Sequence, residues 1–108
     1  MKVIFVSGKY KATTENGVYE NIQHARREAH KLWEEGWSVV CPHMNTAFMG
    51  DNDDLKYLDG DLEILRRCDA IYMLNGSEYS LGAIEELKLA KELGLEIIQE
   101  GDYHAPSD

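Results

Sequence analysis

Glu86 is the acidic residue of this sequence whose position best suits chemistry on a bound ligand. Residues 80–83 predict a helix start, with Ser80 as the N-cap and Gly82 small enough to let a ligand approach backbone N–H groups. The buried face of this helix is formed by Ala83, Leu87, Ala90 and Gly94. At about 100° per residue, Glu85 then faces water and Glu86 lies on the flank nearest the sheet. The alternative is an acid that only complements the helix dipole.

Asp61 is the second candidate carboxylate. It lies beside Leu62, on the flank of a stripe of leucines at helical spacing. The stripe is formed by Leu55, Leu58, Leu62 and Leu65. Gly60 interrupts this pattern, so one short helix can end there and another begin, which would make Asp61 an N-cap residue instead. The sequence leaves both a role in chemistry and a role in capping open.

Polar residues also follow the first two expected strands. After the first strand come Ser7, Gly8, Lys9 and Tyr10, and after the second come His43 and Asn45. The first-loop lysine and tyrosine can touch a phosphate or a base, whereas the glycine alone can be a simple turn residue. The histidine and asparagine can bind substrate hydroxyls or support a carboxylate, although a loop histidine bonded to backbone is an equal alternative. The first loop lacks GxGxxG and GxxxxGK[ST], so no nucleotide cofactor is expected.

No metal site is expected either. The four histidines, His24, His30, His43 and His104, lack HExxH spacing. Residues 51–54 (Asp-Asn-Asp-Asp) resemble part of a calcium loop but lack its glycine and its terminal glutamate, which favours a solvated loop. Cys41 and Cys68 have no CxxC partner, so we expect both to be buried, reduced thiols.

The elements that must position these residues alternate along the chain. Apolar runs predict buried strands at residues 3–6, 38–41, 70–74 and 96–99. Helices are expected at residues 18–33, 55–67 and 80–93, and Gly36 is the stop signal of the first. A loop is expected at residues 43–54. This order predicts a three-layer α/β fold of the flavodoxin or Rossmann type. Its doubly wound parallel sheet would have four to five strands in the order 2-1-3-4, with ligands bound beyond their carboxyl ends.

Length and charge limit the possible partners. The chain has 108 residues, which predicts one α/β domain over residues 1–100 and a polar tail over 101–108. Its formal net charge of -9 argues against a nucleic acid polymer or an anionic membrane surface as partner. The first apolar stretch is too short for a secretion signal or a membrane span, so we expect a cytoplasmic protein.

Four segments together resemble the nucleoside 2-deoxyribosyltransferase superfamily, in particular a compact, DUF4406-like branch. They are SGKY, ENIQHARREAHKLWEEGWSVVCPHMNT, GDLEILRRCDAIYML and SLGAIEELKLAKELG, and the resemblance covers residues 1 to 99. The family's nucleophile is a glutamate in a serine-x-glycine-x-x-x-glutamate setting, which here is Glu86. The resemblance also implies Asp61 as the family's aspartate and Tyr10 as its first-loop aromatic residue. It implies Ser80 as the contact to a 5'-phosphate in relatives that accept one.

The resemblance implies an enzyme that cleaves or exchanges the N-glycosidic bond of a (deoxy)nucleoside or nucleoside 5'-monophosphate. It also implies a homodimer or higher homo-oligomer, because relatives complete one site with residues of a neighbouring subunit. The first loop and the short chain depart from the well-studied transferases, which leaves the base and the acceptor open. Two alternatives remain: a non-catalytic nucleotide-binding module that uses the same pocket, and an interaction protein with exposed Trp37 or Tyr79 at its contact surface.

Overall fold

The computed structural model describes residues 1–47, 49, 57–102 and 105–106. Its centre is a four-stranded, fully parallel sheet in the order β2-β1-β3-β4. The strands are β1 (Val3–Ser7), β2 (Ser38–Val40), β3 (Ala70–Met73) and β4 (Glu96–Gln99). The predicted α/β fold class and strand order are therefore confirmed, with four strands among the described residues.

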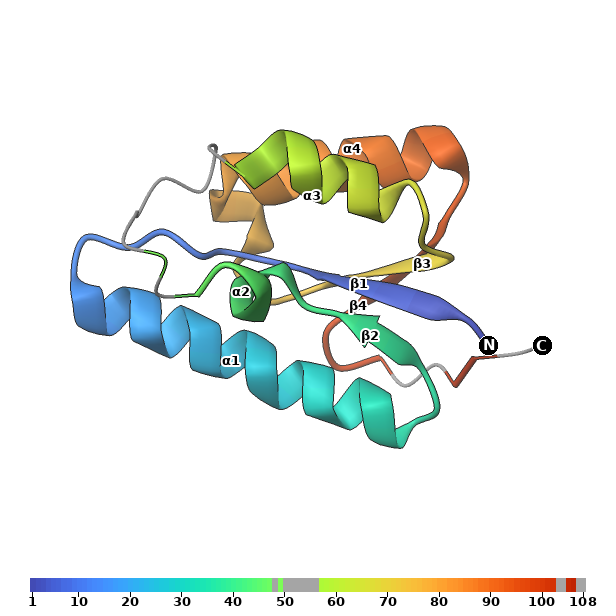
Figure 1. The fold of residues 1–108 in the computed structure, drawn as a ribbon, viewed down its shortest axis with the longest axis horizontal. Helices are drawn as coiled ribbons and strands as arrows, with labels where there is room; N and C mark the ends of the chain where they lie inside the picture. Colours follow the sequence, from blue (N-terminus) through green and yellow to red (C-terminus); the bar gives the residue numbers. More distant parts are fainter. Residues whose placement is uncertain (48, 50–56, 103–104, 107–108) are drawn as a thin grey trace.

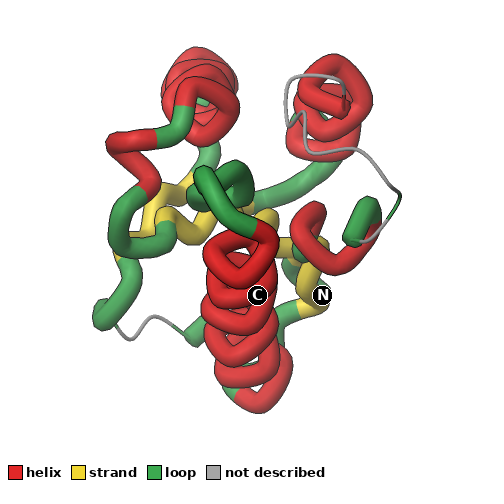
Figure 2. Tube along the Cα trace, turned by 90° about the vertical axis from the view of Figure 1, so that its left-hand side faces the viewer, coloured by secondary structure: helices red, strands yellow, loops and turns green. Residues whose placement is uncertain are grey.

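Helices cover both faces of this sheet. They are α1 (Glu15–Glu34), α2 (Pro42–Asn45), α3 (Leu58–Leu65) and α4 (Leu81–Leu93), with a short 3-10 turn, η2 (Ser77–Tyr79), before α4. In Figure 1, α1 runs along one face, and α3 and α4 lie together on the other. Figure 2 shows the strands between these two groups of helices. The result is the expected three-layer arrangement.

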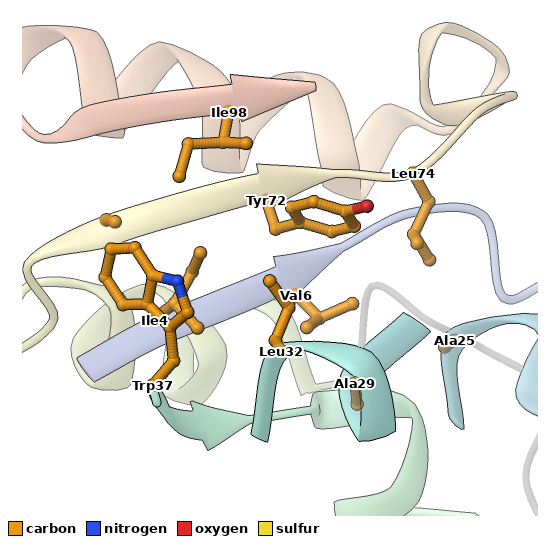
Figure 3. Packing of buried hydrophobic residues seen from close by; sticks show 10 residues of the cluster. Ile4, Val6, Ala25, Ala29, Leu32, Trp37, Tyr72, Leu74 and Ile98 are labelled. Carbon is orange, nitrogen blue, oxygen red and sulfur yellow. The ribbon is translucent and has the colours of Figure 1, made fainter. Parts of the chain in front are cut away.

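Alternation along β1 divides the core between the two faces. Ile4 and Val6 belong to the cluster that packs against α1, whereas Phe5 belongs to the cluster beneath α3 and α4. Figure 3 shows the first cluster, in which side chains from β1, β3 and β4 meet those of α1. By the same alternation, Ser7 shares the face of Phe5 and points toward α4. A polar group at the end of the central strand is thereby placed under the helix that carries Glu86.

The two tryptophans differ in exposure, and Trp37 is buried where an exposed contact residue was considered. Trp37 is only 1% exposed, because Gly36 adopts a positive φ of 104° and the chain turns so that the indole packs into the α1 cluster. Trp33, near the end of α1, is by contrast 53% exposed. Trp37 is thus not available as a surface contact, whereas Tyr79 is exposed as expected.

Two helix boundaries also differ from the sequence prediction. Residues 42–45, mostly assigned to a loop, form α2, because Pro42 is well suited to the first turn of a helix. Helix α3 continues through Gly60, so Asp61 lies inside the helix and is not its N-cap.

The acidic run at residues 51–54 lies outside the described residues. Within the described part of the chain, no helix is long and apolar enough to cross a membrane.

Candidate functional site

A cleft opens at the carboxyl ends of β1 and β3, where the strand order reverses. Ligands of open α/β sheets bind at this position. Four segments line the cleft: the loop after β1, α2 with the residue after it, the start of α3 and the first turns of α4. Its lining residues are Val6, Gly8, Tyr10, Pro42, His43, Thr46, Tyr57, Leu58, Asp61, Ser80, Gly82, Ala83 and Glu86. Six of the predicted site residues besides Glu86 are among them.

Glu86 reaches the cleft from the second turn of α4. The helix begins at Ser80, whose Oγ accepts a hydrogen bond from the Ala83 backbone N–H at 3.1 Å. Glu86 is 7% exposed, while Glu85 faces solvent, as the helical geometry predicted. Its Oε1 accepts a hydrogen bond of 2.6 Å from the buried hydroxyl of Ser7. The side chain is therefore fixed at the cleft wall.

Asp61 brings a second carboxyl group to the same cleft from α3. Burial raises its pKa to about 6, from an ordinary value of 3.8. Desolvation has this effect because it disfavours the charged form of a carboxyl group. A group with this pKa exchanges a proton readily near neutral pH, as a general acid or base must.

Two aromatic rings also line the cleft, Tyr10 from the loop after β1 and His43 from α2. Tyr10 and His43 pack edge to face, with ring centroids 5.7 Å apart and planes at 68°. The His43 Nε2 lies 2.9 Å from the Lys9 carbonyl oxygen. Because a carbonyl can only accept, this nitrogen carries the proton and donates it. The bond ties α2 to the first loop and keeps both rings at the cleft.

Gly8 is required at its position by close packing. A Cβ atom there would lie 2.6 Å from Leu74 Cδ1 and 2.8 Å from Leu74 Cβ. The first loop can thus leave β1 only if this residue has no side chain. The same packing holds the loop close to the end of β3.

Three predicted site residues lie outside the cleft lining. Ser7 is 1% exposed and contacts Glu86 from the sheet side instead of facing the cleft. Lys9 lines a neighbouring hollow together with Lys11 and Tyr79. Ser80 lines both this hollow and the cleft. Asn45 is placed in a different groove, because the helical turn of α2 points it away from His43.

Sequence reasoning missed other residues that line the cleft, chiefly Thr46 and Tyr57. Thr46 follows α2 directly, so recognising Pro42 as a helix start would have placed it near the strand end. Tyr57 lies just before α3 and carries no local signal of its role. None of the described lining residues is a lysine or an arginine. The cleft interior thus combines two carboxyl groups with aromatic and small side chains.

Comparison with known proteins places the chain in a family. The family model described as "Domain of unknown function (DUF4406)" matches residues 2–99. The chain belongs to the DUF4406 family. This DUF4406 member also resembles a solved structure, a 2-desoxiribosyltransferase from Leishmania mexicana, with a TM-score of 0.61 and 18% sequence identity. The match covers 92% of this chain and 63% of that chain, so the DUF4406 member spans less than two thirds of its neighbour's length. No curated protein matches it.

These comparisons confirm two parts of the sequence prediction. The DUF4406 match agrees with the compact branch that the four segments resemble. The solved structure shows that the DUF4406 member shares its fold with a deoxyribosyltransferase. Among the described residues of the DUF4406 member, no three histidine, cysteine or acidic side chains are grouped as metal ligands would be.

Proposed function

We propose that this protein cleaves or exchanges the N-glycosidic bond of a (deoxy)nucleoside or a nucleoside 5'-monophosphate. The observation that carries the proposal is the meeting of Glu86 and Asp61, from two different helices, in one cleft at the carboxyl edge of the sheet. Enzymes that cleave a glycosidic bond through a covalent intermediate usually use two carboxyl groups, one on either side of that bond. The fold shared with a deoxyribosyltransferase supports the same chemistry.

In the proposed reaction Glu86 is the nucleophile. A carboxylate oxygen of Glu86 forms a bond to the anomeric carbon of the sugar while the bond from that carbon to the base nitrogen breaks. The bonding electrons leave with the base, and Asp61 supplies the proton that the base nitrogen gains. Water or a second base then attacks the same carbon, returns Glu86 to its carboxylate form and gives its proton to Asp61. Water yields hydrolysis, and a base yields transfer.

The cleft lining suggests how the substrate lies. The rings of Tyr10, His43 and Tyr57 offer apolar faces and edges to a planar base. The carboxyl groups are placed for the sugar. A 5'-phosphate would extend past Ser80 toward Lys9 and Lys11, since no described residue lining the cleft is a lysine or an arginine and the adjoining hollow has two lysines.

Loss of activity in a Glu86→Ala variant is the direct test. Purified protein is incubated with a panel of nucleosides and nucleoside 5'-monophosphates, and free base is measured by chromatography, with and without a second base. We expect wild type to release or exchange base and Glu86→Ala to fall by at least about a thousandfold, as loss of a nucleophile does. The matched control is Glu85→Ala, which removes the neighbouring solvent-facing carboxylate.

Two outcomes would contradict the proposal. Glu86→Ala that keeps wild-type activity and a wild-type melting curve would remove Glu86 from the mechanism. Saturable nucleotide binding by calorimetry, with no base released from any member of the panel, would favour the non-catalytic binding module.

A further inference from the structure

The buried hydroxyl group of Ser7 donates a hydrogen bond to the Glu86 carboxylate. Ser7 Oγ donates to Glu86 Oε1 at 2.6 Å, and the two residues are 1% and 7% exposed. A short hydrogen bond from a hydroxyl to a carboxylate, shielded from water, is among the stronger kinds that proteins make. Glu86 lines the cleft and Ser7 does not, so the hydroxyl contacts the carboxylate from the sheet side and not from the cleft.

The sheet fixes the position of this hydroxyl. Ser7 ends β1, the strand that pairs with both β2 and β3, and its register partner is Met73. The Ser7 carbonyl oxygen accepts a hydrogen bond of 2.9 Å from the Leu74 N–H. The next residue, Gly8, packs closely on Leu74. The backbone of Ser7 is thus fixed by the β1–β3 hydrogen bonds and by the packing of Gly8 on Leu74. Its hydroxyl can therefore set the orientation of the Glu86 side chain on α4.

From this geometry we propose that Ser7 is a positioning residue for Glu86. Its hydroxyl orients the carboxylate toward the sugar and keeps it in the ionised form that attacks. The inference rests on the proposed function and adds a residue that neither touches substrate nor lines the cleft. A hydrogen bond donated to a carboxylate stabilises its charged form, so the bond prepares the nucleophile before substrate arrives.

Other titratable groups face the same cleft, so the test must observe Glu86 itself. These groups are Tyr10, His43, Tyr57 and Asp61. In protein labelled with carbon-13 at the glutamate side-chain carboxyl carbon, the Glu86 signal can be assigned by its loss in Glu86→Gln. Its titration by NMR requires no substrate and no turnover. The acid limb of the kcat/KM profile then provides a second, kinetic measurement.

We expect Ser7→Ala to move the titration midpoint of Glu86 upward by about one pH unit, because a donor to its charged form is lost. We also expect kcat to fall about ten- to a hundredfold with little change in KM, and the acid limb to shift in the same direction. Ser7→Cys, which keeps a weak donor of similar size, should lie between Ser7→Ala and wild type. Ser77→Ala, which truncates another buried serine outside the cleft lining, should match wild type.

The contradicting results separate the two proposals. Unchanged Glu86 titration and unchanged kcat in a folded Ser7→Ala or Ser7→Cys variant, with wild type active, would overturn the role of Ser7 alone. An inactive wild type would overturn the proposed function and, with it, the positioning role. If Ser7→Ala fails to fold, Ser7→Cys carries the comparison, and a wild-type titration in that variant would count against the inference.

Discussion

At the scale of single residues, Asp61 combines a functional advantage with a cost in stability. Its folded-state pKa of about 6 lies above the ordinary 3.8, so between these pH values the folded protein binds a proton that the unfolded chain has released. Stability contributed by this group therefore falls as pH rises from about 4 to 6 and stays low above that. The group poised for acid–base work near neutral pH is the same group that burial penalises.

An Asp61→Asn variant should separate these two effects. The amide cannot transfer the proton, so we expect base release to fall about a hundred- to ten-thousandfold. The amide also has no charge to desolvate, so the free energy of unfolding at pH 8 should rise by about 1 kcal/mol after allowance for solvent screening. Thermal melts at pH 4 and pH 8 measure this effect, with Asp59→Asn as the control on the same helix. Equal melting temperatures for Asp61→Asn and wild type at pH 8 would count against the raised pKa.

Lys9 should affect phosphate recognition without affecting the bond-breaking step. It is exposed and lines the hollow beside Ser80, outside the acidic cleft. We expect Lys9→Ala to lower kcat/KM for a nucleoside 5'-monophosphate about two- to fivefold, and to leave the value for the matching nucleoside unchanged. Lys88→Ala, on the exposed side of α4, is the control. Equal losses for both substrates would argue that no phosphate binds near Lys9.

At the scale of elements, a buried polar contact attaches α1 to the sheet. The Tyr72 hydroxyl on β3 donates to Glu28 Oε1 at 2.8 Å, and Lys31 Nζ lies 2.8 Å from Glu28 Oε2. Burial raises the pKa of Glu28, but the hydrogen bonds from Lys31 and Tyr72 outweigh it and leave the pKa below 4.5. The stabilisation is therefore complete well above pH 4.5 and is lost as pH falls through the lowered pKa.

Removal of the tyrosine hydroxyl should weaken this attachment. We expect Tyr72→Phe to lose about 1–3 kcal/mol of unfolding free energy at pH 7, because the buried carboxylate loses a donor. The loss should be smaller at pH 3 than at pH 7, because Glu28 takes up a proton as pH falls through its lowered pKa. Chemical denaturation at the two pH values measures it, and Tyr19→Phe, on the outer side of α1, is the control. A loss that does not depend on pH would point to packing and not to the carboxylate.

The elements also show what local sequence can and cannot predict. Apolar runs and helical spacing placed all four strands and the orientation of Glu86 relative to Glu85, because both depend on periodicity alone. They missed α2, and they left open a helix break at Gly60, where α3 continues. Among the described residues, a Cβ atom added at Gly60 would meet no atom outside its own helix within 4 Å, so no close packing there requires glycine. A single glycine costs a helix only about 1 kcal/mol relative to alanine, so it does not end a helix by itself.

At the scale of the whole molecule, the parallel sheet brings together segments that are far apart in the sequence. Ser7 and Glu86 are 79 residues apart and form a hydrogen bond. The rule for α/β sheets predicted the edge at which they meet, and from it came most of the candidate residues. The rule gives no direction for individual side chains, so it could not predict that Asn45 lines a different groove or that Tyr57 lines the cleft.

Charge and surface also bear on the whole molecule. The protein has a formal net charge of -9 and acidic groups in its cleft. Long-range electrostatic repulsion therefore disfavours a nucleic acid polymer more than a small substrate. A second groove beside the edge strand β2 carries Trp33 and Met44, both about half exposed. Assembly into a homodimer or higher oligomer stays a prediction.

The most direct test of the central claim is the mass of the intact protein during turnover. The protein is incubated with an excess of a reactive deoxynucleoside and then quenched with acid, which should trap the sugar as an ester of Glu86. Peptide sequencing by mass spectrometry should place the added deoxyribosyl mass on that residue. Glu86→Gln should show no adduct. An active wild type that never carries the added mass, or that carries it on another residue, would contradict the assignment of Glu86 as nucleophile.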